Sequence, residues 1–429
     1  MRRFMPAFIV FMTLSLAGCG GGSSSVTPPP PPPPVTNTAT IDFASSNQTI
    51  RGFGGSTAWM PVMPTSEVNA LFGTGANQIG LTILRVRIDP GSVPGGSNWD
   101  AEVSNAQEAI AAGSSVSVIA TPWTPPAAYK SNDNTVMGSL NTANYGDYAN
   151  YLESFVTYMA NANPPVNLYG ISMQNEPDAS VSYESCVWTP DQMHTWVASN
   201  SSVLTTRLIM PESESFNTSY SDPALDDPNA VGNIGIIAGH LYGASPSYYA
   251  NAVNAGKEVW MTEHFLNPAG AEPAIGDALQ AAMEIHNSLT VGDYSAYVWW
   301  WVANWNPGGG TTNTGLVDTN NVPTYFGWAM AQFSRFVRPG YVRSNVTNNP
   351  APDILISAYK GNSGFVIVAI NRRSISVDQT FIIQNQNIAA MTPYLTTATD
   401  TVAQQSAVSV GGDQFVYTLP AQSIATFVQ

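Results

Sequence analysis

Basic residues are scarce in this chain of 429 residues, which has 14 Lys and Arg against 29 Asp and Glu and a formal net charge of −15. Binding to nucleic acid requires clustered Lys and Arg that neutralise phosphates, so the composition excludes DNA and RNA as partners. An acidic balance of this kind favours solubility and carries no information about the fold. We therefore expect an uncharged ligand.

Cysteine is almost absent as well, since Cys19 and Cys186 are the two in the chain. If Cys19 is used for another purpose, Cys186 has no partner and the mature domain must fold without a disulfide. We expect Cys186 to pack in the interior. The alternative, a catalytic thiol, would need a lowered pKa and a nearby base.

The first nineteen residues indicate a separate role for Cys19. Arg2 and Arg3 precede an apolar run over residues 4–16, a pattern typical of an export signal. The tetrad LAGC at residues 16–19 resembles the lipobox of bacterial lipoproteins. This resemblance implies that residues 1–18 are removed as a signal peptide and that Cys19 is acylated as a lipid anchor. A plain secretory signal with an incidental cysteine is the alternative.

Long apolar runs are missing after this signal, because no later segment reaches the roughly 18 uninterrupted apolar residues of a transmembrane helix. Acyl chains anchor a protein without spanning the bilayer. Gly20 stands where lipoproteins retained in the inner membrane usually carry aspartate, so we expect anchoring in the outer membrane, facing the exterior, or otherwise secretion. A tethered monomer is the default expectation for the oligomeric state. Residues 19–37 read as a linker rich in Gly, Ser and Pro, with prolines 28–34 as a stiff spacer.

Between residues 48 and 338 the sequence alternates short apolar runs with stretches rich in Ala, Asn and Gln that suit helices. Buried parallel strands read as continuous apolar runs because helices cover the outside of their sheet. Eight of them favour a (β/α)8 barrel over residues 48–338. A doubly wound open sheet is the alternative, but it predicts a phosphate-binding glycine loop whose spacing the first run lacks. The runs cover residues 49–55, 82–88, 116–123, 168–177, 207–212, 234–242, 258–265 and 296–301.

The pattern changes in residues 339–429, where short alternating strands are separated by Gly and Asn turns. Examples are residues 354–359, 364–371 and 379–383. No long helical period appears, so this part predicts an antiparallel β-sandwich beside the barrel. Residues 38–47 precede the barrel and are expected to add one or more strands to that side domain.

Several of the barrel runs carry a polar residue at or near their end. Among them, Glu176 stands near the end of the fourth run and Glu263 near the end of the seventh. The active site of such a barrel lies at the carboxyl ends of its strands, where these two side chains would face each other. A glycosidase uses a carboxyl pair of this kind, one protonated to assist the leaving group and one ionised. The alternative for either residue is a surface carboxylate held in a salt bridge.

The sequence around these glutamates narrows the family. Asn175-Glu176-Pro177 resembles the acid/base motif of the clan A glycoside hydrolases, and from about residue 48 to the end the chain resembles family 30, specifically its bacterial subfamily 8 xylanases. The resemblance implies a barrel fused to a side β-domain, retaining stereochemistry, no metal and no cofactor, with Glu176 as acid/base and Glu263 as nucleophile. The motifs that carry it are GFGG at 52–55, ILRV at 83–86, TPWTPP at 121–126, QNEPD at 174–178, YESC at 183–186, HLYG at 240–243, WMTE at 260–263 and MAQFSRFVRPG at 330–340.

Neighbouring polar residues take roles from the mechanism and the resemblance together. Asn175 can hydrogen-bond the 2-hydroxyl of the sugar, a contact that strengthens in the transition state. Arg85, taken here to stand at the end of the second run, can hold Glu263 ionised through charge and bidentate hydrogen bonding. Tyr242 is expected to do similar work from the sixth run.

The substrate-binding candidates also include three tryptophans and a histidine. Trp59, Trp123 and Trp300 are candidate platforms for sugar rings, and packing in the core is the alternative for each. His240 is either a substrate-binding residue or a purely structural one.

One departure from the family pattern bears on the substrate. Subfamily 8 glucuronoxylanases carry two arginines after the tryptophans of the eighth strand, one of which binds the glucuronate branch of xylan, and here those positions are Ala303 and Asn304. The loop at residues 265–270 also lacks the Tyr and Ser contacts of the family. A buried carboxylate without a cation is costly. We therefore expect an endo-β-1,4-xylanase that does not depend on glucuronic acid branches.

Two further interpretations stay open from the sequence. The altered loops permit another family 30 specificity, such as a xylobiohydrolase, a β-1,6-glucanase or a β-1,6-galactanase. The other is a surface glycan-binding lipoprotein without catalysis, against which the presence of both glutamates, Asn175 and Arg85 argues.

Overall fold

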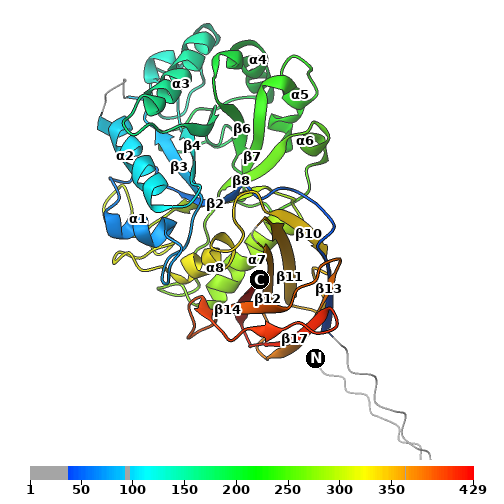
Figure 1. The fold of residues 1–429 in the computed structure, drawn as a ribbon. Helices are drawn as coiled ribbons and strands as arrows, with labels where there is room; N and C mark the ends of the chain where they lie inside the picture. Colours follow the sequence, from blue (N-terminus) through cyan, green and yellow to red (C-terminus); the bar gives the residue numbers. More distant parts are fainter. Residues whose placement is uncertain (1–36, 92–96, 363) are drawn as a thin grey trace, which may run out of the picture. The chain divides into compact units, whose positions relative to one another are not determined.

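The computed structural model describes residues 37–91, 97–362 and 364–429 (Figure 1). The predicted signal peptide, the lipidation site Cys19 and most of the predicted linker lie outside these residues. Within the described part of the chain, no helix combines the length and apolarity that a membrane span needs. Cys186 is buried, and burial raises the pKa of its thiol to about 12, which agrees with a packing role.

Eight parallel strands close into a barrel in chain order, and β9 pairs back onto β2. The predicted barrel is thereby confirmed, with a strand overlapping each of the eight apolar runs. Side chains such as Ile83, Ile209 and Trp260 are fully buried and fill the centre of the barrel. The strands are β2 (Gly52–Ser56), β3 (Ile83–Ile88), β4 (Ser117–Pro122), β5 (Leu168–Ser172), β6 (Arg207–Ser213), β7 (Ile234–His240), β8 (Glu258–Glu263) and β9 (Ala296–Trp301).

An α-helix follows each barrel strand, and the helices surround the barrel (Figure 1). Their apolar faces supply the layer that buries the outer side of the strands, as on α7, where Leu279, Ala282, Ile285 and Leu289 are buried. The helices are α1 (Thr65–Phe72), α2 (Ser97–Ala112), α3 (Tyr145–Ala160), α4 (Pro190–Asn200), α5 (Asp222–Leu225), α6 (Ala250–Asn254), α7 (Ile275–Thr290) and α8 (Tyr325–Ser334).

The side domain is one ten-stranded sheet with the order β15-β14-β18-β12-β11-β10-β1-β13-β17, in which β16 also pairs with β14. Its pairs are antiparallel except that β1 runs parallel to β13, so the sheet is mixed. The strands are β1 (Asn37–Asp42), β10 (Val342–Val346), β11 (Ile354–Gly361), β12 (Gly364–Asn371), β13 (Val377–Gln384), β14 (Ala390–Thr396), β15 (Ala403–Gln404), β16 (Val408–Ser409), β17 (Gln414–Leu419) and β18 (Ser423–Val428).

This sheet curls until its two halves pack on each other. In a flat sheet β13 and β18 would lie about 24 Å apart, because they are five strands removed and strands are spaced about 4.8 Å. Yet the rings of Phe381 on β13 and Phe427 on β18 lie 5.1 Å apart, and Phe415 on β17 packs against both. The sandwich-like core predicted from the alternating pattern is therefore formed by one curled sheet.

Helices α7 and α8 join the barrel to the side sheet (Figure 1). Gln332 on α8 donates a 2.8 Å hydrogen bond to the Thr396 hydroxyl, and its backbone carbonyl accepts one of 2.7 Å from Thr426. On α7, His286 is 1% exposed. Burial, with a smaller effect of the Arg343 charge, lowers the pKa of His286 to about 4.

This buried histidine predicts a loss of stability in acid. The imidazole of His286 has an ordinary pKa of about 6.5 and a folded pKa of about 4, so between these pH values the unfolded chain binds a proton that the folded chain does not bind. The free energy of unfolding therefore falls by roughly 1.4 kcal/mol for each unit that the pH decreases. We expect the stability of the wild type relative to His286→Gln to decline by about 3 kcal/mol from pH 7 to pH 4. Denaturant unfolding of both proteins across this range measures the difference. Other titrating groups are common to both and cancel, so a difference that stays constant with pH contradicts the prediction.

Candidate active site

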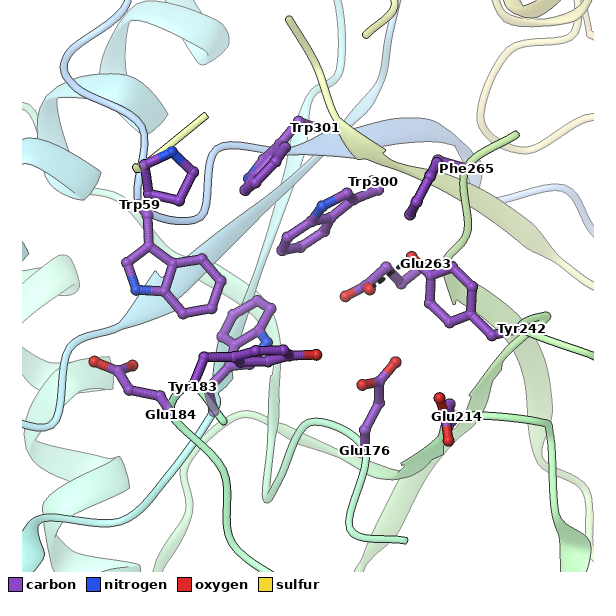
Figure 2. A pocket seen from close by; sticks show the side chains of 12 residues that line it. Trp59, Glu176, Tyr183, Glu184, Glu214, Tyr242, Glu263, Phe265, Trp300 and Trp301 are labelled. Atoms are coloured by element: carbon purple, nitrogen blue, oxygen red, sulfur yellow. Dashed lines mark hydrogen bonds between the residues drawn. The ribbon is translucent and has the colours of Figure 1, made fainter. Parts of the chain in front are cut away.

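A cavity of about 560 Å³ opens at the carboxyl ends of the barrel strands (Figure 2). Aromatic rings form most of its wall, and every charged side chain among the described residues that line it is a glutamate. The lining residues are Trp59, Trp123, Glu176, Tyr183, Glu184, Glu214, Tyr242, Glu263, Phe265, Trp300, Trp301 and Pro307.

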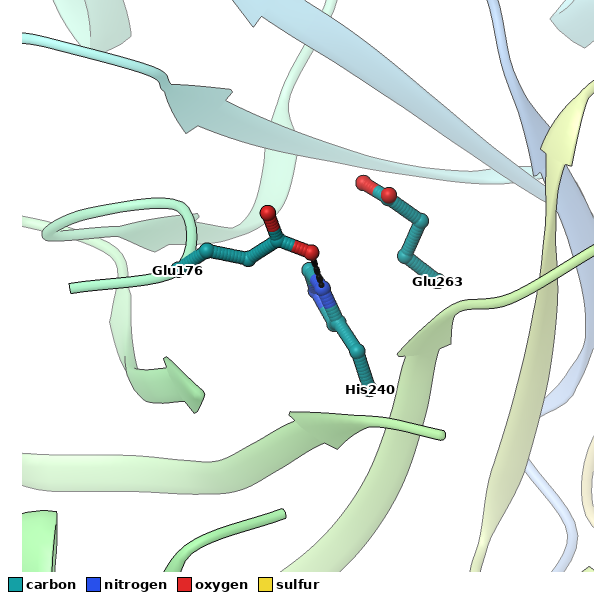
Figure 3. A group of neighbouring side chains, drawn as sticks. All are labelled: Glu176, His240 and Glu263. Carbon is teal, nitrogen blue, oxygen red and sulfur yellow. Dashed lines mark hydrogen bonds and ion pairs between the residues drawn. The ribbon is translucent and has the colours of Figure 1, made fainter. Parts of the chain in front are cut away.

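The two predicted carboxylates meet in this cavity, each only 5% exposed. A carboxylate oxygen of Glu176, one of Glu263 and a ring nitrogen of His240 all lie within 4.8 Å of one another (Figure 3). Retaining glycosidases hold their carboxyl groups about 5–5.5 Å apart, whereas inverting ones need a wider gap for a water molecule. The short separation therefore suits direct attack by one carboxylate.

The backbone turns sharply to present Glu176. This residue has φ +43°, in the left-handed region that few side chains adopt without support. The support comes from two hydrogen bonds of 2.9 Å, from the Glu176 N–H to the carbonyl of Glu212 and from the Asn175 N–H to the carbonyl of Pro122. The adjoining strands β4 and β6 thus hold the turn that follows β5.

Glu263 ends β8 and accepts hydrogen bonds at both oxygens. Arg85 on β3 donates from Nη1 to Oε2 at 2.5 Å, and the Tyr242 hydroxyl donates to Oε1 at 2.9 Å. Burial raises the pKa of Glu263, while the charges of His240 and Arg85 oppose that rise. Hydrogen bonds to the charged form stabilise it, so both donors favour the ionised carboxylate.

Arg85 is fully buried and binds more than Glu263. Its Nη2 donates to Asn175 Oδ1 at 2.6 Å, and its Nε donates to the Thr121 hydroxyl at 3.2 Å. Because Arg85 Nη2 donates to the carbonyl oxygen of Asn175, the NH2 group is the end of this amide left to face a sugar hydroxyl. The guanidinium thus fixes which end of Asn175 faces a substrate.

His240 ends β7 with its Nδ1 2.9 Å from Glu176 Oε1. Burial disfavours a charged ring, but Glu263, Glu176 and Glu212 outweigh this and raise the pKa of His240 to about 9. The imidazolium therefore donates from Nδ1 to Glu176 at neutral pH.

The cluster of Glu176, His240 and Glu263 has a spacing that a metal ion could use. A protonated His240 has no lone pair to give, and Glu263 is already paired with Arg85. The donors are thus engaged by a proton and a guanidinium.

Sequence reasoning missed Glu212, which lies near the end of β6 with its side chain fully buried. Oε1 lies 3.4 Å from Arg85 Nη2 and 3.9 Å from His240 Nε2. Burial alone would raise the pKa of Glu212, but these two cations lower it to about 2. The signal was present, because Glu212 is the last residue of the fifth apolar run, as Glu176 and Glu263 stand near the ends of theirs.

The three predicted tryptophans all line the cavity, and Figure 2 shows Trp59 and Trp300 among its aromatic rings. The ring of Trp59 lies 4.8 Å from that of Trp123 and 6.2 Å from that of Trp300, and Trp123 and Trp300 are 5.7 Å apart. Trp123 is only 2% exposed and its ring carries the Arg85 guanidinium at 4.7 Å, so it also packs in the core. Trp301, which the sequence analysis did not select, stacks on Trp300 at 4.9 Å and extends the wall.

Comparison with known proteins places the chain among glycoside hydrolases. No family model matches it. It is 36% identical over 404 residues to the glucuronoxylanase XynC of Bacillus subtilis strain 168, a match that covers 91% of both proteins. Its structure resembles the family 30 subfamily 8 xylanase Xyn30A of Clostridium acetobutylicum, with a TM-score of 0.84 and 40% identity over 92% of this chain and 99% of that one. The chain belongs to glycoside hydrolase family 30.

A second solved family 30 structure gives the same picture. An endoxylanase from Clostridium papyrosolvens C71 has a TM-score of 0.81 and 34% identity, covering 91% of this chain and 99% of that one. The family resemblance stated from the sequence motifs is therefore confirmed.

The two positions where this family 30 chain departs from the arginine pattern lie after β9. Ala303 is buried, and Asn304 Oδ1 accepts a 2.8 Å hydrogen bond from the backbone N–H of Gly315. Both residues line a smaller cavity of about 260 Å³ together with Glu67 and Asp318. Among the described residues that line either cavity, none is Lys or Arg.

The contacts of Glu263 generate a prediction for this family 30 site. Tyr242→Phe removes one donor to the carboxylate, and a hydrogen bond to a charged group is worth roughly 1.5–3 kcal/mol, so we expect kcat to fall about 10- to 100-fold. Steady-state kinetics on a soluble polysaccharide measure it. Tyr297→Phe is the matched control, because the Tyr297 hydroxyl donates to Glu284 at 2.6 Å away from the cavity lining. It should reduce stability alone, and an equal loss of kcat in both variants would contradict the assignment.

Proposed function

We propose that this chain is a retaining endo-β-1,4-xylanase that does not depend on glucuronic acid branches. The observation that carries the catalytic part is the short separation of Glu176 and Glu263, with ligand atoms within 4.8 Å in an aromatic cavity. The substrate class is supported by the relatives, named as a glucuronoxylanase and as xylanases of family 30.

The proposed reaction has two steps. In the first, Glu176 gives its proton to the leaving glycosidic oxygen while Glu263 attacks the anomeric carbon, so that the glycosidic bond breaks and a glycosyl ester forms. In the second, Glu176 takes a proton from water, the water oxygen attacks the same carbon, and Glu263 leaves as a carboxylate. Two inversions retain the configuration.

Each neighbour acts on one of these steps. Arg85 and Tyr242 favour the ionised Glu263 before attack and after release. The Asn175 amide, oriented by Arg85, offers its NH2 to the sugar 2-hydroxyl. Trp59, Trp300 and Trp301 present ring surface on which the apolar faces of xylose residues can pack.

Independence from glucuronate rests on the charges of the cavity. A bound glucuronate would bring another carboxylate among Glu184, Glu214 and the catalytic pair, and like charges at short distance disfavour one another. The positions of the missing arginines offer a methyl group and an amide already engaged by the backbone of Gly315. Losing water from a carboxylate at such a site would be costly.

Product analysis on two substrates tests this proposal. We expect the full chain to cut linear xylan and unbranched xylo-oligosaccharides, and to release from glucuronoxylan fragments whose methylglucuronate stands at variable positions. Mass spectrometry and chromatography of the products show this, with Glu263→Gln as the inactive control. If unbranched xylan goes uncut while glucuronoxylan gives products with the branch at one fixed position, the proposal fails. Cleavage of a β-1,6-glucan or a β-1,6-galactan instead would move the chain to another family 30 specificity.

We also propose that the enzyme is lipid-anchored in the cell envelope through Cys19, facing the exterior of the outer membrane. The support is the lipobox-like tetrad at residues 16–19 with Gly20 after it. Metabolic labelling with a radioactive fatty acid should label the wild type and not Cys19→Ser, and the variant should leave the membrane fraction. Cys186→Ser is the matched control. The thiol of Cys186 is buried, so this variant should keep the label on Cys19. Equal labelling of wild type and Cys19→Ser would refute the anchor.

A further inference from the structure

Glu212 is a buried carboxylate that the two-step reaction does not use. Its side chain is fully buried and does not belong to the cavity lining. Its backbone carbonyl accepts the 2.9 Å hydrogen bond from the N–H of Glu176, and both residues have positive φ, +54° and +43°. The chain at Glu212 is therefore directly coupled to the turn that presents Glu176.

The side chain of Glu212 lies between two cations. Oε2 accepts a 3.1 Å hydrogen bond from the Thr121 hydroxyl, and Oε1 faces Arg85 Nη2 at 3.4 Å and His240 Nε2 at 3.9 Å. Within the described part of the chain, neither Glu212 Oε1 nor His240 Nε2 has a hydrogen-bond partner. These two buried atoms therefore interact through their charges and not through a hydrogen bond.

His240 is surrounded by charged and titratable groups from every neighbouring strand end. Glu176 meets its Nδ1, Glu212 faces its Nε2, and Glu263 lies within 4.8 Å through its carboxylate. The Tyr242 ring lies 6.2 Å away edge-on. Three carboxylates thus surround the imidazole of His240. The same three carboxylates also interact with the charge of Arg85.

The charges of this buried group balance in one protonation state. Arg85 and His240 are positive and Glu212 and Glu263 are negative, so the sum is zero when Glu176 carries its proton. That is the state the first step requires. Without the charge of Glu212 the group would hold an excess positive charge in a buried site, which favours losing the proton of His240.

We propose that Glu212 is a positioning residue, whose buried carboxylate keeps His240 protonated and so holds its Nδ1–H on Glu176 Oε1. Glu212 touches no substrate and acts through His240 and through its own carbonyl. The low pKa of Glu212, about 2, supports a charge that persists at every working pH. This inference rests on the proposed roles of Glu176 and Glu263, but not on which polysaccharide is cut.

Glu212→Gln tests the proposal, because it removes the charge and keeps the size and an oxygen for Thr121. The pH profile of kcat/KM should shift as a whole to lower pH, with its basic limb moving by about one unit, since one nearby charge shifts a pKa by roughly one to three units. At a pH on the wild-type basic limb, kcat should fall about tenfold for one unit, with KM unchanged. A profile whose limbs stay in place while kcat falls at every pH would overturn the proposal in favour of a structural role.

Glu102→Gln is the matched control. Glu102 is another buried barrel carboxylate, which accepts hydrogen bonds from Thr57 and from the backbone of Arg87 and which has no ion pair with Arg85 or His240. Its replacement should leave both limbs in place. An equal shift in the two variants would show that any buried carboxylate has this effect and would refute the assignment of Glu212.

A spectroscopic measurement tests the proposal without a substrate. The chain has four histidines, so the ¹⁵N signals of its imidazoles can be followed individually, with His240→Gln assigning one of them. In the wild type His240 should remain protonated at pH 8, and in Glu212→Gln it should lose its proton at lower pH. A neutral His240 in the wild type at pH 8 would refute the proposal. Failure to cut xylan would instead refute the proposed substrate and leave this signal unchanged.

Discussion

The ion pair between Arg85 and Glu263 is the interaction on which the site depends. A guanidinium with no solvent exposure is costly unless its charge and its N–H groups are matched, and breaking one partner of such a pair is strongly destabilising. Arg85 meets this demand by contacting Thr121, Asn175, Glu212 and Glu263, which come from strands β4, β6 and β8 and the turn after β5. The closed barrel is what brings these chain segments around one side chain.

The fold of the barrel mouth also depends on the contacts within the site. Six of the eight barrel strands, β3 to β8, contribute a charged or polar group to the same buried network from the strand itself or the turn after it, so moving one of them would leave a charge unmatched. The left-handed backbone at Glu176 and at Glu212 is tolerated because a hydrogen bond joins the two turns. Catalytic geometry and the local stability of the barrel mouth are set by the same contacts.

The sequence predicted the barrel well because each buried parallel strand reads as an apolar run. The end of the fourth run was less accurate: the run extends to residue 177, whereas β5 ends at Ser172 and the chain then turns to present Glu176. The parallel pairing of β1 with β13 was not predicted, because it joins residues about 340 positions apart and no local pattern carries that register. A long-range pairing of this kind is visible only once the barrel has placed both segments.

The two glutamates were found because each combines a strand end with a recognisable motif, and Glu212 was missed because it has the strand end alone. Its meaning comes from Arg85 and His240, which are far from it in sequence and close only in the closed barrel. The tryptophan wall was found in part, since Trp301 follows Trp300 in a strand and strand alternation predicts opposite directions for neighbours. Both line the cavity because β9 ends there and the pairing of its last residue shifts against β2.

Chemistry and specificity in this chain therefore have different structural sources. The network of Arg85 is built from strand ends and balances its own charge, so it does not need the loops that surround it. The segment after β9 carries Ala303 and Asn304 and makes its own contacts, such as the bond from Gly315, without touching that network. Under the proposed function, the segment with Ala303 and Asn304 accounts for the independence from an acidic branch, whereas the strand-end network around Glu176 and Glu263 carries out the reaction.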